Sequence, residues 1–217
     1  MIDRMDTYLF QGKRKKMLEE LRHKGIKEEV LTAMFKVPRH VFYDSALVHF
    51  AYDENNAFHI GEGQTISRPS TVAIQTELLD IKKGDKVLEI GTGCGYQTAV
   101  LLEMGAKVWS IERQSKLYEK TRLFLPQLGY NARFYHGDGY KGLPLQAPFD
   151  KIIVTCGAPF IPKDLLLQLK ENGGMMVIPV GEGEVQVMNI IVRKTGMEFD
   201  KRELGNFKFV PMLKDKR

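Results

Sequence analysis

The feature that most constrains the fold of this chain is a regular alternation of short β-rich runs with helical runs between residues 86 and 180. The β-rich runs are bounded by turn residues, and the runs between them have apolar positions at helical spacing. Strands that alternate with helices form a parallel sheet, because each crossover passes over one face of the sheet. We therefore predict a doubly wound, mostly parallel α/β sheet with helices on both faces. The predicted strands are 86–90, 107–111, 132–136, 149–155 and 173–180, and the predicted helices are 96–104, 114–127 and 163–170.

Both ends of the chain depart from this alternation. Residues 13–23 and 27–35 have helical periodicity and predict a small helical N-terminal segment, and residues 70–81 predict a further helix ahead of the first strand. Residues 184–194 and a β-rich run through 208–212 have only a turn between them. This pattern predicts an antiparallel C-terminal hairpin at one edge of the sheet.

Length and composition favour one domain. A chain of 217 residues with 43% apolar content can bury one sizeable core. No apolar run approaches the roughly 20 residues needed to span a bilayer, and the start MIDRMDTYLF lacks the pattern of a secretory signal. We expect a cytoplasmic protein with no membrane partner. Its single domain, 1–217, is expected to comprise a helical segment 1–58, a loop and helix start 59–75, a core 76–183, and a hairpin and tail 184–217.

Charge and cysteine usage exclude several classes of function. The formal net charge is +5, but the excess lies in GKRKK at 12–16 and LKDKR at 213–217, which read as solvated ends. We therefore expect no nucleic-acid partner, and we expect a monomer. Cys94 and Cys156 have no metal-ligand spacing, so we interpret both as small packing residues and expect no metal.

A glycine-rich turn follows the first strand of the core. The run VLEIGTGCGYQ places Gly91, Gly93 and Gly95 between that strand and the next helix, where glycine permits a tight turn and close approach of a ligand. The spacing is GxGxG, whereas a dinucleotide-binding turn has GxGxxG. The turn therefore favours a nucleotide-like ligand other than a dinucleotide.

Three acidic residues lie at the ends of successive strands. Glu112, 21 positions after Gly91, suits a ribose diol, and Asp138, followed by Gly139, could meet an adenine amino group. Glu89 lies two residues before the turn, where its charge would repel a pyrophosphate, and no Lys or Arg in the turn offsets it. The three carboxylates predict a cationic cofactor.

These residues resemble the ExGxGxG motif of class I S-adenosylmethionine-dependent methyltransferases, which implies a Rossmann-like fold. The stretches IGEGQTISRPSTVA, FDKIIVTCGAPFIPKDLLLQLKENGGMMVIPVG and FKFVPML further resemble the protein-L-isoaspartate O-methyltransferase family, from about residue 5 to residue 213. That resemblance implies methyl transfer from S-adenosyl-L-methionine to the free carboxylate of L-isoaspartyl residues in damaged proteins, with S-adenosyl-L-homocysteine as product. The ester then cyclises to a succinimide, which begins repair.

The resemblance also implies roles for individual residues. Ser67 matches the family's active-site serine, although it could instead be the N-cap of the following helix. Gln64 and Thr65 are expected to line the pocket for the cofactor's amino-acid end. A substrate groove is expected to be lined by TCGAP, through the backbone at Ala158, and by FVPML, through Val210 and Pro211. FVPML could instead be an ordinary edge strand.

Two other functional classes stay open on the sequence alone. A methyltransferase of the same fold that acts on a small molecule or RNA would keep Glu89, Gly91, Glu112 and Asp138 but would not need GQTIS. A nonenzymatic cofactor-binding protein would show no turnover. Methyl transfer to a carboxylate fits a chain without a catalytic triad, because a carboxylate is ionised at neutral pH and needs no general base.

Overall fold

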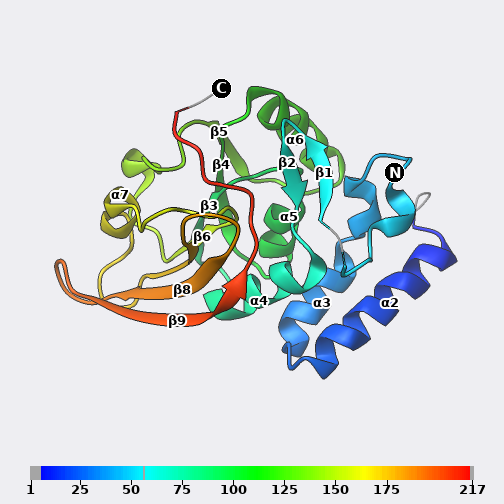
Figure 1. Cartoon of the computed structure of the whole chain (residues 1–217), viewed down its shortest axis with the longest axis horizontal. Coiled ribbons are helices and arrows are strands. Elements are labelled where there is room, and N and C mark those ends of the chain that lie inside the picture. The colour runs from blue at the N-terminus through cyan, green and yellow to red at the C-terminus, as the bar shows by residue number, and fades with distance from the viewer. Residues whose placement is uncertain (1–5, 56, 216–217) are drawn as a thin grey trace.

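The computed structural model describes residues 6–55 and 57–215 and contains one seven-stranded sheet with the order β5-β4-β3-β6-β7-β8-β9 (Figure 1). Within this sheet, strands β3 to β7 pair in parallel, and β8 and β9 pair antiparallel at one edge. This confirms the predicted mostly parallel sheet with a C-terminal hairpin. The strands are β3 (Lys86–Ile90), β4 (Lys107–Glu112), β5 (Arg133–His136), β6 (Lys151–Val154), β7 (Met175–Val180), β8 (Gln186–Arg193) and β9 (Phe199–Phe207).

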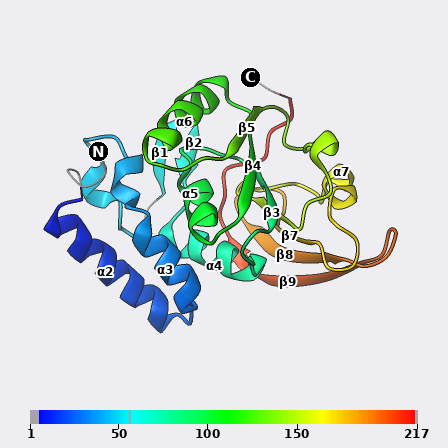
Figure 2. The same ribbon diagram turned by 180° about the vertical axis from the view of Figure 1, so that it is seen from behind.

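Helices cover both faces of the sheet, as predicted. Figures 1 and 2 show α4, α5 and α6 on one side and α7 on the other. Within the described ranges, no helix is both long enough and apolar enough to cross a bilayer. The helices are α2 (Tyr8–His23), α3 (Glu28–Lys36), α4 (Pro69–Leu79), α5 (Tyr96–Glu103), α6 (Ser115–Gln127) and α7 (Lys163–Leu167), with 3-10 turns η1 (Arg39–Phe42), η2 (Val48–Phe50) and η3 (Pro144–Gln146).

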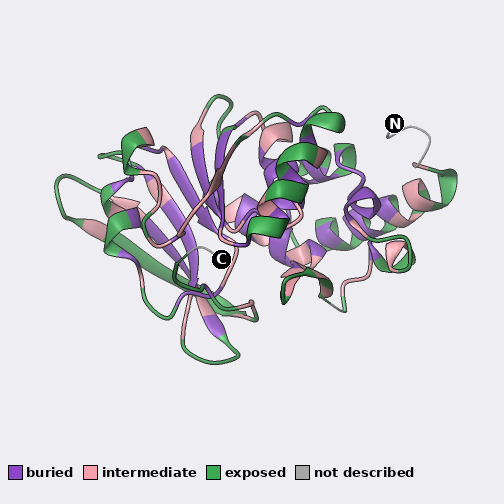
Figure 3. Cartoon of the chain, turned by 90° about the horizontal axis from the view of Figure 1, so that it is seen from above, coloured by how far each residue is buried: buried purple, intermediate pink, exposed green. Residues whose placement is uncertain are grey.

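The core strands are buried on both faces because helices cover each side. Val87 and Val108 belong to an apolar cluster with Leu79 of α4 and Leu101 of α5. Leu88 belongs to a second apolar cluster, which includes Ile152 of β6 and Leu165 of α7. Figure 3 shows this buried centre between more exposed helices. The alternation of side chains along β3 therefore decides which residues face α5 and which face the other layer.

The N-terminal segment packs on helices rather than on the sheet. α2 contacts α3, and α3 contacts α4 and α5. Met17, Leu21 and Met34 are buried in this cluster, at the helical spacing that predicted the two helices. The segment thus covers the helical layer beside the glycine turn.

A short hairpin replaces the first part of the loop expected within 59–75. Strands β1 (Phe58–Gly61) and β2 (Gln64–Ile66) pair antiparallel around a turn in which Glu62 and Gly63 have φ values of 52° and 69°. Two central residues with positive φ define a tight hairpin turn, usually Asn-Gly or Asp-Gly. Glu62 is an uncommon residue there, which explains why the sequence did not indicate a hairpin.

The C-terminal tail also differs from the prediction. β9 ends at Phe207, and residues 208–213 leave the hairpin and run across the carboxyl ends of the parallel strands (Figure 1). The Gly157 N–H donates to the Val210 carbonyl at 2.8 Å, and the Met212 N–H donates to the Gly157 carbonyl at 2.7 Å. Pro211 between them has no N–H for a strand ladder. The expected strand through 212 is therefore a tail segment that pairs with Gly157, three residues after the end of β6.

Candidate active site

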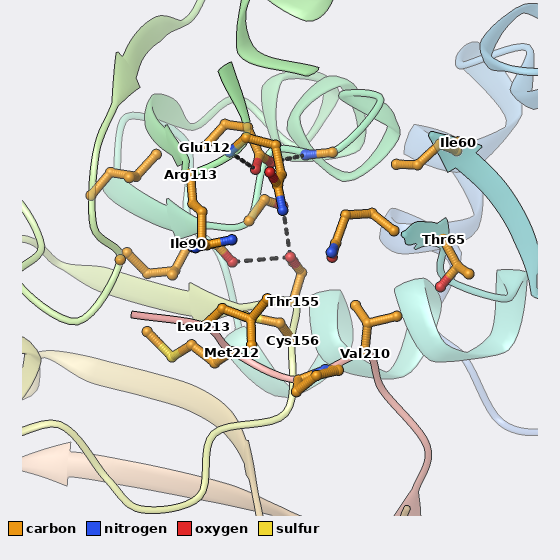
Figure 4. A pocket seen from close by; sticks show the side chains of 17 residues that line it. Ile60, Thr65, Ile90, Glu112, Arg113, Thr155, Cys156, Val210, Met212 and Leu213 are labelled. Carbon is orange, nitrogen blue, oxygen red and sulfur yellow. Dashed lines mark hydrogen bonds between the residues drawn. The ribbon is translucent and has the colours of Figure 1, made fainter. Parts of the chain in front are cut away.

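The carboxyl ends of β3, β4 and β6 form the floor of a pocket (Figure 4). The hairpin β1–β2 and the C-terminal tail form its walls, and it holds about 580 Å³ of space including open solvent at its mouth. The lining includes eight residues that the sequence predicted: Gln64, Thr65, Gly91, Gly93, Glu112, Gly139, Val210 and Pro211.

Gly91 fits its position because a side chain there has no room. Its φ is +95°, and a Cβ on it would lie 2.5 Å from Thr155 Oγ1. The Thr155 hydroxyl is itself held by the carbonyl oxygens of Ile90 at 3.0 Å and Gly91 at 2.7 Å. The glycine turn and the end of β6 are therefore in direct contact, and the backbone of the turn faces the pocket.

The Glu112 carboxylate is fixed by two backbone donors at the end of β4. The Gly93 N–H donates to Oε2 at 2.8 Å, and the Gln114 N–H donates to Oε1 at 2.8 Å. The residue is only 5% exposed, yet it lines the pocket. Each oxygen keeps acceptor capacity beyond its backbone bond. Two neighbouring acceptors held in this way suit a vicinal diol.

Glu89 does not lie in the pocket, contrary to the prediction. It is fully buried, and its Oε2 accepts hydrogen bonds from Thr98 of α5 at 2.5 Å and Ser110 of β4 at 2.7 Å. Side chains alternate along β3, so the residue two positions before Gly91 faces α5 rather than the strand ends. Burial raises the pKa of Glu89 to about 7, because desolvation outweighs the two hydrogen bonds. Glu89 supports the glycine turn from beneath.

Gly95 and Asp138 are also outside the lining of the pocket. A Cβ on Gly95 would lie 2.6 Å from Leu125 Cδ1, so this glycine permits contact between the turn and α6 instead of contact with a ligand. The Asp138 Oδ1 accepts the Tyr140 N–H at 2.9 Å within its own turn. Its neighbour Gly139 does line the pocket, where a Cβ would lie 2.4 Å from Ile90 Cγ2.

Ser67 lies just beyond the main pocket, between two smaller cavities. One cavity includes the glycine turn and Tyr96, the other includes Lys208 of the tail, and Thr65 and Thr155 line all three spaces. The alternative that Ser67 is the N-cap is wrong, because α4 begins at Pro69 and its N-cap is the next residue, Arg68. The described part of the chain offers the Ser67 hydroxyl no hydrogen-bond partner.

Arg39 holds the Ser67 segment in place. Its Nη2 donates to the Ser67 carbonyl at 2.6 Å and to the Tyr43 hydroxyl at 3.0 Å, and its Nε donates to the Ala51 carbonyl at 2.7 Å. The guanidinium also lies over the Tyr96 ring, 4.6 Å from its centroid. Arg39 is 1% exposed, so it joins the N-terminal segment, β2 and α5 within the core.

The expected role of the Ala158 backbone is wrong. The Ala158 N–H donates to the Pro179 carbonyl at 2.9 Å, and its carbonyl accepts the Gly181 N–H at 2.9 Å. Gly157 is equally occupied by the tail. Because these groups already have partners, the TCGAP backbone does not present a free edge to an extended peptide.

Several lining residues were not predicted as site residues. Arg113 donates from Nε to the carbonyls of Lys214 at 3.0 Å and Asp215 at 2.6 Å, which ties the tail to the end of β4. Cys156 is a free cysteine in the lining, and burial raises its pKa to about 12, so its thiol stays protonated. Arg113 and Cys156 each follow the end of a strand, and this position is the sequence signal that could have identified them as site residues. The other unpredicted lining residues are Ile60, Ile90, Ile111, Gln114, Thr155, Met212 and Leu213.

The described residues contain no group of three or more His, Cys, Asp or Glu side chains placed to hold a metal ion. The polar groups of the pocket are a fixed carboxylate, hydroxyls and the glycine backbone. This donor set suits an organic ligand with a ribose. A ligand bound to these groups would lie beside the Ser67 segment.

Comparison with known proteins gives the family. The model of the protein-L-isoaspartate(D-aspartate) O-methyltransferase family matches residues 12–217. The chain belongs to this family. Protein-L-isoaspartate O-methyltransferases from Christiangramia forsetii and Flavobacterium psychrophilum are each 58% identical to it over 213 residues, covering 97% of this chain and 99% of each relative.

Solved structures of the family have the same fold. One protein-L-isoaspartate O-methyltransferase superposes with a TM-score of 0.82 at 29% identity, covering 91% of this chain and 65% of that one. A Plasmodium falciparum protein named as a beta-aspartate methyltransferase, in complex with S-adenosyl-L-homocysteine, gives a TM-score of 0.80 at 27% identity. That match covers 93% of this chain and 99% of the other. The Rossmann-like methyltransferase fold is therefore confirmed.

Proposed function

We propose that this protein transfers the methyl group of S-adenosyl-L-methionine to the free carboxylate of L-isoaspartyl residues in damaged proteins and peptides. The observation that carries the proposal is the pocket at the carboxyl edge, where Glu112 and the glycine turn lie beside the Ser67 segment. Membership of the protein-L-isoaspartate O-methyltransferase family supports the same reaction. The methyl ester would cyclise to a succinimide and begin repair.

The residues of the pocket fit the proposed cofactor. Glu112 would accept hydrogen bonds from the ribose hydroxyls, because its two oxygens are already oriented by the Gly93 and Gln114 N–H groups. Gly91, Gly93 and Gly139 would let the ligand approach the backbone. Gln64 and Thr65 of β2 would meet the amino-acid end. Asp138 would reach the adenine edge only from outside this lining, beside Gly139. When bound, the cofactor supplies an electrophilic methyl group.

The acceptor needs orientation rather than activation. Its carboxylate has a pKa below about 4 and is ionised at neutral pH, so no residue has to remove a proton. The chain must bring one carboxylate oxygen into line with the methyl group and exclude competing water. The cavities that meet at Thr65, Ser67 and Thr155 support this geometry.

Ser67 is the proposed catalytic residue, as a positioner of the substrate carboxylate. A neutral hydroxyl orients the anion without stabilising its charge strongly, whereas a guanidinium clamp would stabilise a charge that disappears in the transition state. The Ser67 hydroxyl has no partner among the described residues, so it is available to the substrate. Val210 and Pro211 of the tail would bound the peptide on the opposite side.

We place the reaction in the cytoplasm, with the enzyme acting as a monomer and without a nucleic-acid partner. Two free cysteines are compatible with a reducing compartment. The basic excess of GKRKK lies in α2 and not at the pocket, which supports a protein or peptide substrate over a polyanion.

The proposal is tested with two peptides that differ only at one residue, isoaspartate or aspartate. The protein is incubated with each peptide and with cofactor carrying a labelled methyl group, and the base-labile methyl ester is measured. We expect label on the isoaspartyl peptide and at least tenfold less on the aspartyl peptide. Equal labelling of both peptides, or labelling only of added RNA or small molecules, would contradict the proposed substrate.

A further inference from the structure

The cavity on the tail side of Ser67 has an uneven charge. Two basic side chains, Arg68 and Lys208, line it together with Ser67, Thr155 and Phe209, and no carboxylate is among its lining residues. Arg68 follows β2 and Lys208 follows β9, so the two charges come from opposite walls. We call Arg68 and Lys208 the basic rim.

The charge of the basic rim is largely uncompensated by the chain itself. The Arg68 guanidinium forms no hydrogen bond or ion pair with another described residue; only the backbone carbonyl of Arg68 is bonded, to the Val72 N–H at 3.1 Å. The carboxylate of Glu54 is bound instead to the N–H of Ser70, two residues after Arg68, at 3.0 Å. Lys208 has an ion pair with Glu184 at 3.6 Å, but the two side chains are 70% and 89% exposed. Such exposed pairs are weak and exchange readily with other partners.

Two other arginines of this protein are satisfied more fully. Arg14 forms a bidentate ion pair with Asp6, with N–O distances of 3.1 Å and 2.8 Å. Arg193 donates hydrogen bonds to two backbone carbonyls and to the Glu171 carboxylate. Arg68 differs from these two because its guanidinium keeps its donors available beside Ser67. Guanidinium groups match carboxylates in shape and charge, so the ligand that best completes Arg68 is a carboxylate.

That carboxylate is not the one that reacts. A guanidinium bonded to the reacting oxygen would hold the negative charge that the methyl transfer removes, and would slow the step. The basic rim instead lies between β2 and the tail, where a peptide bound at Ser67 would leave the cavity. An acidic side chain next to the isoaspartyl residue would reach it.

We propose that Arg68 and Lys208 make this enzyme select isoaspartyl sites that have an acidic residue beside them in the sequence. The inference rests on the proposed function, because it names a preference among substrates of that reaction. Each basic side chain contributes an exposed charge interaction, which corresponds to about a twofold to fivefold preference. The preference decreases as salt rises, because screening weakens exposed pairs.

The test uses three isoaspartyl peptides that carry Glu, Gln or Lys at the same neighbouring position. The quantity measured is the ratio of kcat/KM for the Glu peptide to kcat/KM for the Lys peptide. We expect a ratio of at least about fivefold for the wild type at low salt, mainly through KM. Arg68→Gln and Lys208→Gln should each reduce it, the double variant should abolish it, and Arg68→Lys should keep most of it.

Lys107→Gln is the matched control. It removes one positive charge at the start of β4, at the opposite end of the strand from Glu112, and should keep the wild-type ratio. A wild-type ratio near one, or a ratio that Lys107→Gln lowers as much as Arg68→Gln, would overturn the inference. Failure of the wild type to methylate the Gln peptide would instead overturn the proposed function.

Discussion

On the cofactor side of the pocket, the contacts join the ends of neighbouring strands of one sheet, whereas on the substrate side they join segments that lie outside the sheet. Gly93 and Glu112, which bond at 2.8 Å, are 19 residues apart, in consecutive strand-turn units. On the substrate side, Ser67 is held by Arg39, 28 residues before it, and faces the tail at 208–213. The cofactor half is thus built into the sheet, and the substrate half depends on a few long-range bonds. The two halves should respond differently to mutation.

Arg39→Met should have the largest effect and should affect the substrate side. It leaves the buried carbonyls of Ala51 and Ser67 without donors, and each lost partner costs about 1–3 kcal/mol. We expect the free energy of unfolding to fall by about 2–5 kcal/mol, and the peptide KM to rise more than the cofactor Kd. Denaturant melts, calorimetry and initial rates measure these quantities.

Arg193→Met is the control, because Arg193 also bonds two carbonyls, those of Leu167 and Leu169, but far from the pocket. It should lower stability without a selective change in peptide KM. Equal losses of peptide and cofactor affinity in Arg39→Met would show that the two halves are not independent.

Glu89→Gln tests whether the buried Glu89 carboxyl, which lies below the glycine turn, makes the free energy of unfolding depend on pH. The pKa of Glu89 is raised from 4.5 to about 7 by burial. Between these pH values the folded protein holds a proton that the unfolded chain has lost, so the free energy of unfolding decreases as pH rises toward 7. The wild type should lose about 2–3 kcal/mol from this group between pH 5 and pH 8.

The Glu89→Gln variant should lack that loss, so its stability relative to the wild type should improve as pH rises. Denaturant melts at pH 5 and pH 8 measure the difference. Glu184→Gln, which removes a highly exposed carboxylate, serves as the control. Parallel pH profiles for Glu89→Gln and the wild type would contradict the assignment of a titrating group under the glycine turn.

Ser67→Ala should affect turnover on the substrate side and little else. Loss of the positioning hydroxyl should lower kcat/KM by about 10-fold to 10²-fold, since small misplacements of reacting groups have effects of this size. The free energy of unfolding should change little, because Ser67 is not the N-cap of α4. Ser67→Thr should retain activity only if its hydroxyl still reaches the carboxylate. A fully active Ser67→Ala enzyme would remove Ser67 from the mechanism.

Glu112→Ala should weaken the cofactor side by a smaller amount. Loss of hydrogen bonds to a charged group should raise the Kd for S-adenosyl-L-methionine by an amount equivalent to about 1–3 kcal/mol. The peptide KM at saturating cofactor should change less. Calorimetry on the folded variant decides the matter, and an unchanged Kd would exclude Glu112 from the cofactor site.

The sequence predicted the cofactor side better than the substrate side because its signals are local. Glycines after a strand and an acidic residue after the next strand located Gly91, Gly93 and Glu112 in the lining. The error at Glu89 was avoidable, because alternation along β3 places it with Val87, toward α5. Periodicity predicted both the sheet and its hairpin.

The substrate side depends on contacts that no local pattern encodes. Arg39 lies in η1 and nothing near it in the sequence indicates that it binds the Ser67 carbonyl. The pairing of Val210 and Met212 with Gly157 joins residues more than 50 positions apart. That pairing occupies the backbone that a peptide was expected to use. A family resemblance located these segments, but only the folded arrangement shows how they meet.

The recessed position of Ser67 has a consequence for the proteins that such an enzyme could act on. Ser67 is only partly exposed between β2 and the tail, so a reacting carboxylate has to enter on a narrow, extended stretch of client chain. A loop or chain end can do so at once, whereas a damaged residue within a helix or sheet must wait for that region to open, at a cost that can approach the client's whole stability. The rate of repair at each damaged site would then depend on how often the client protein unfolds locally at that site.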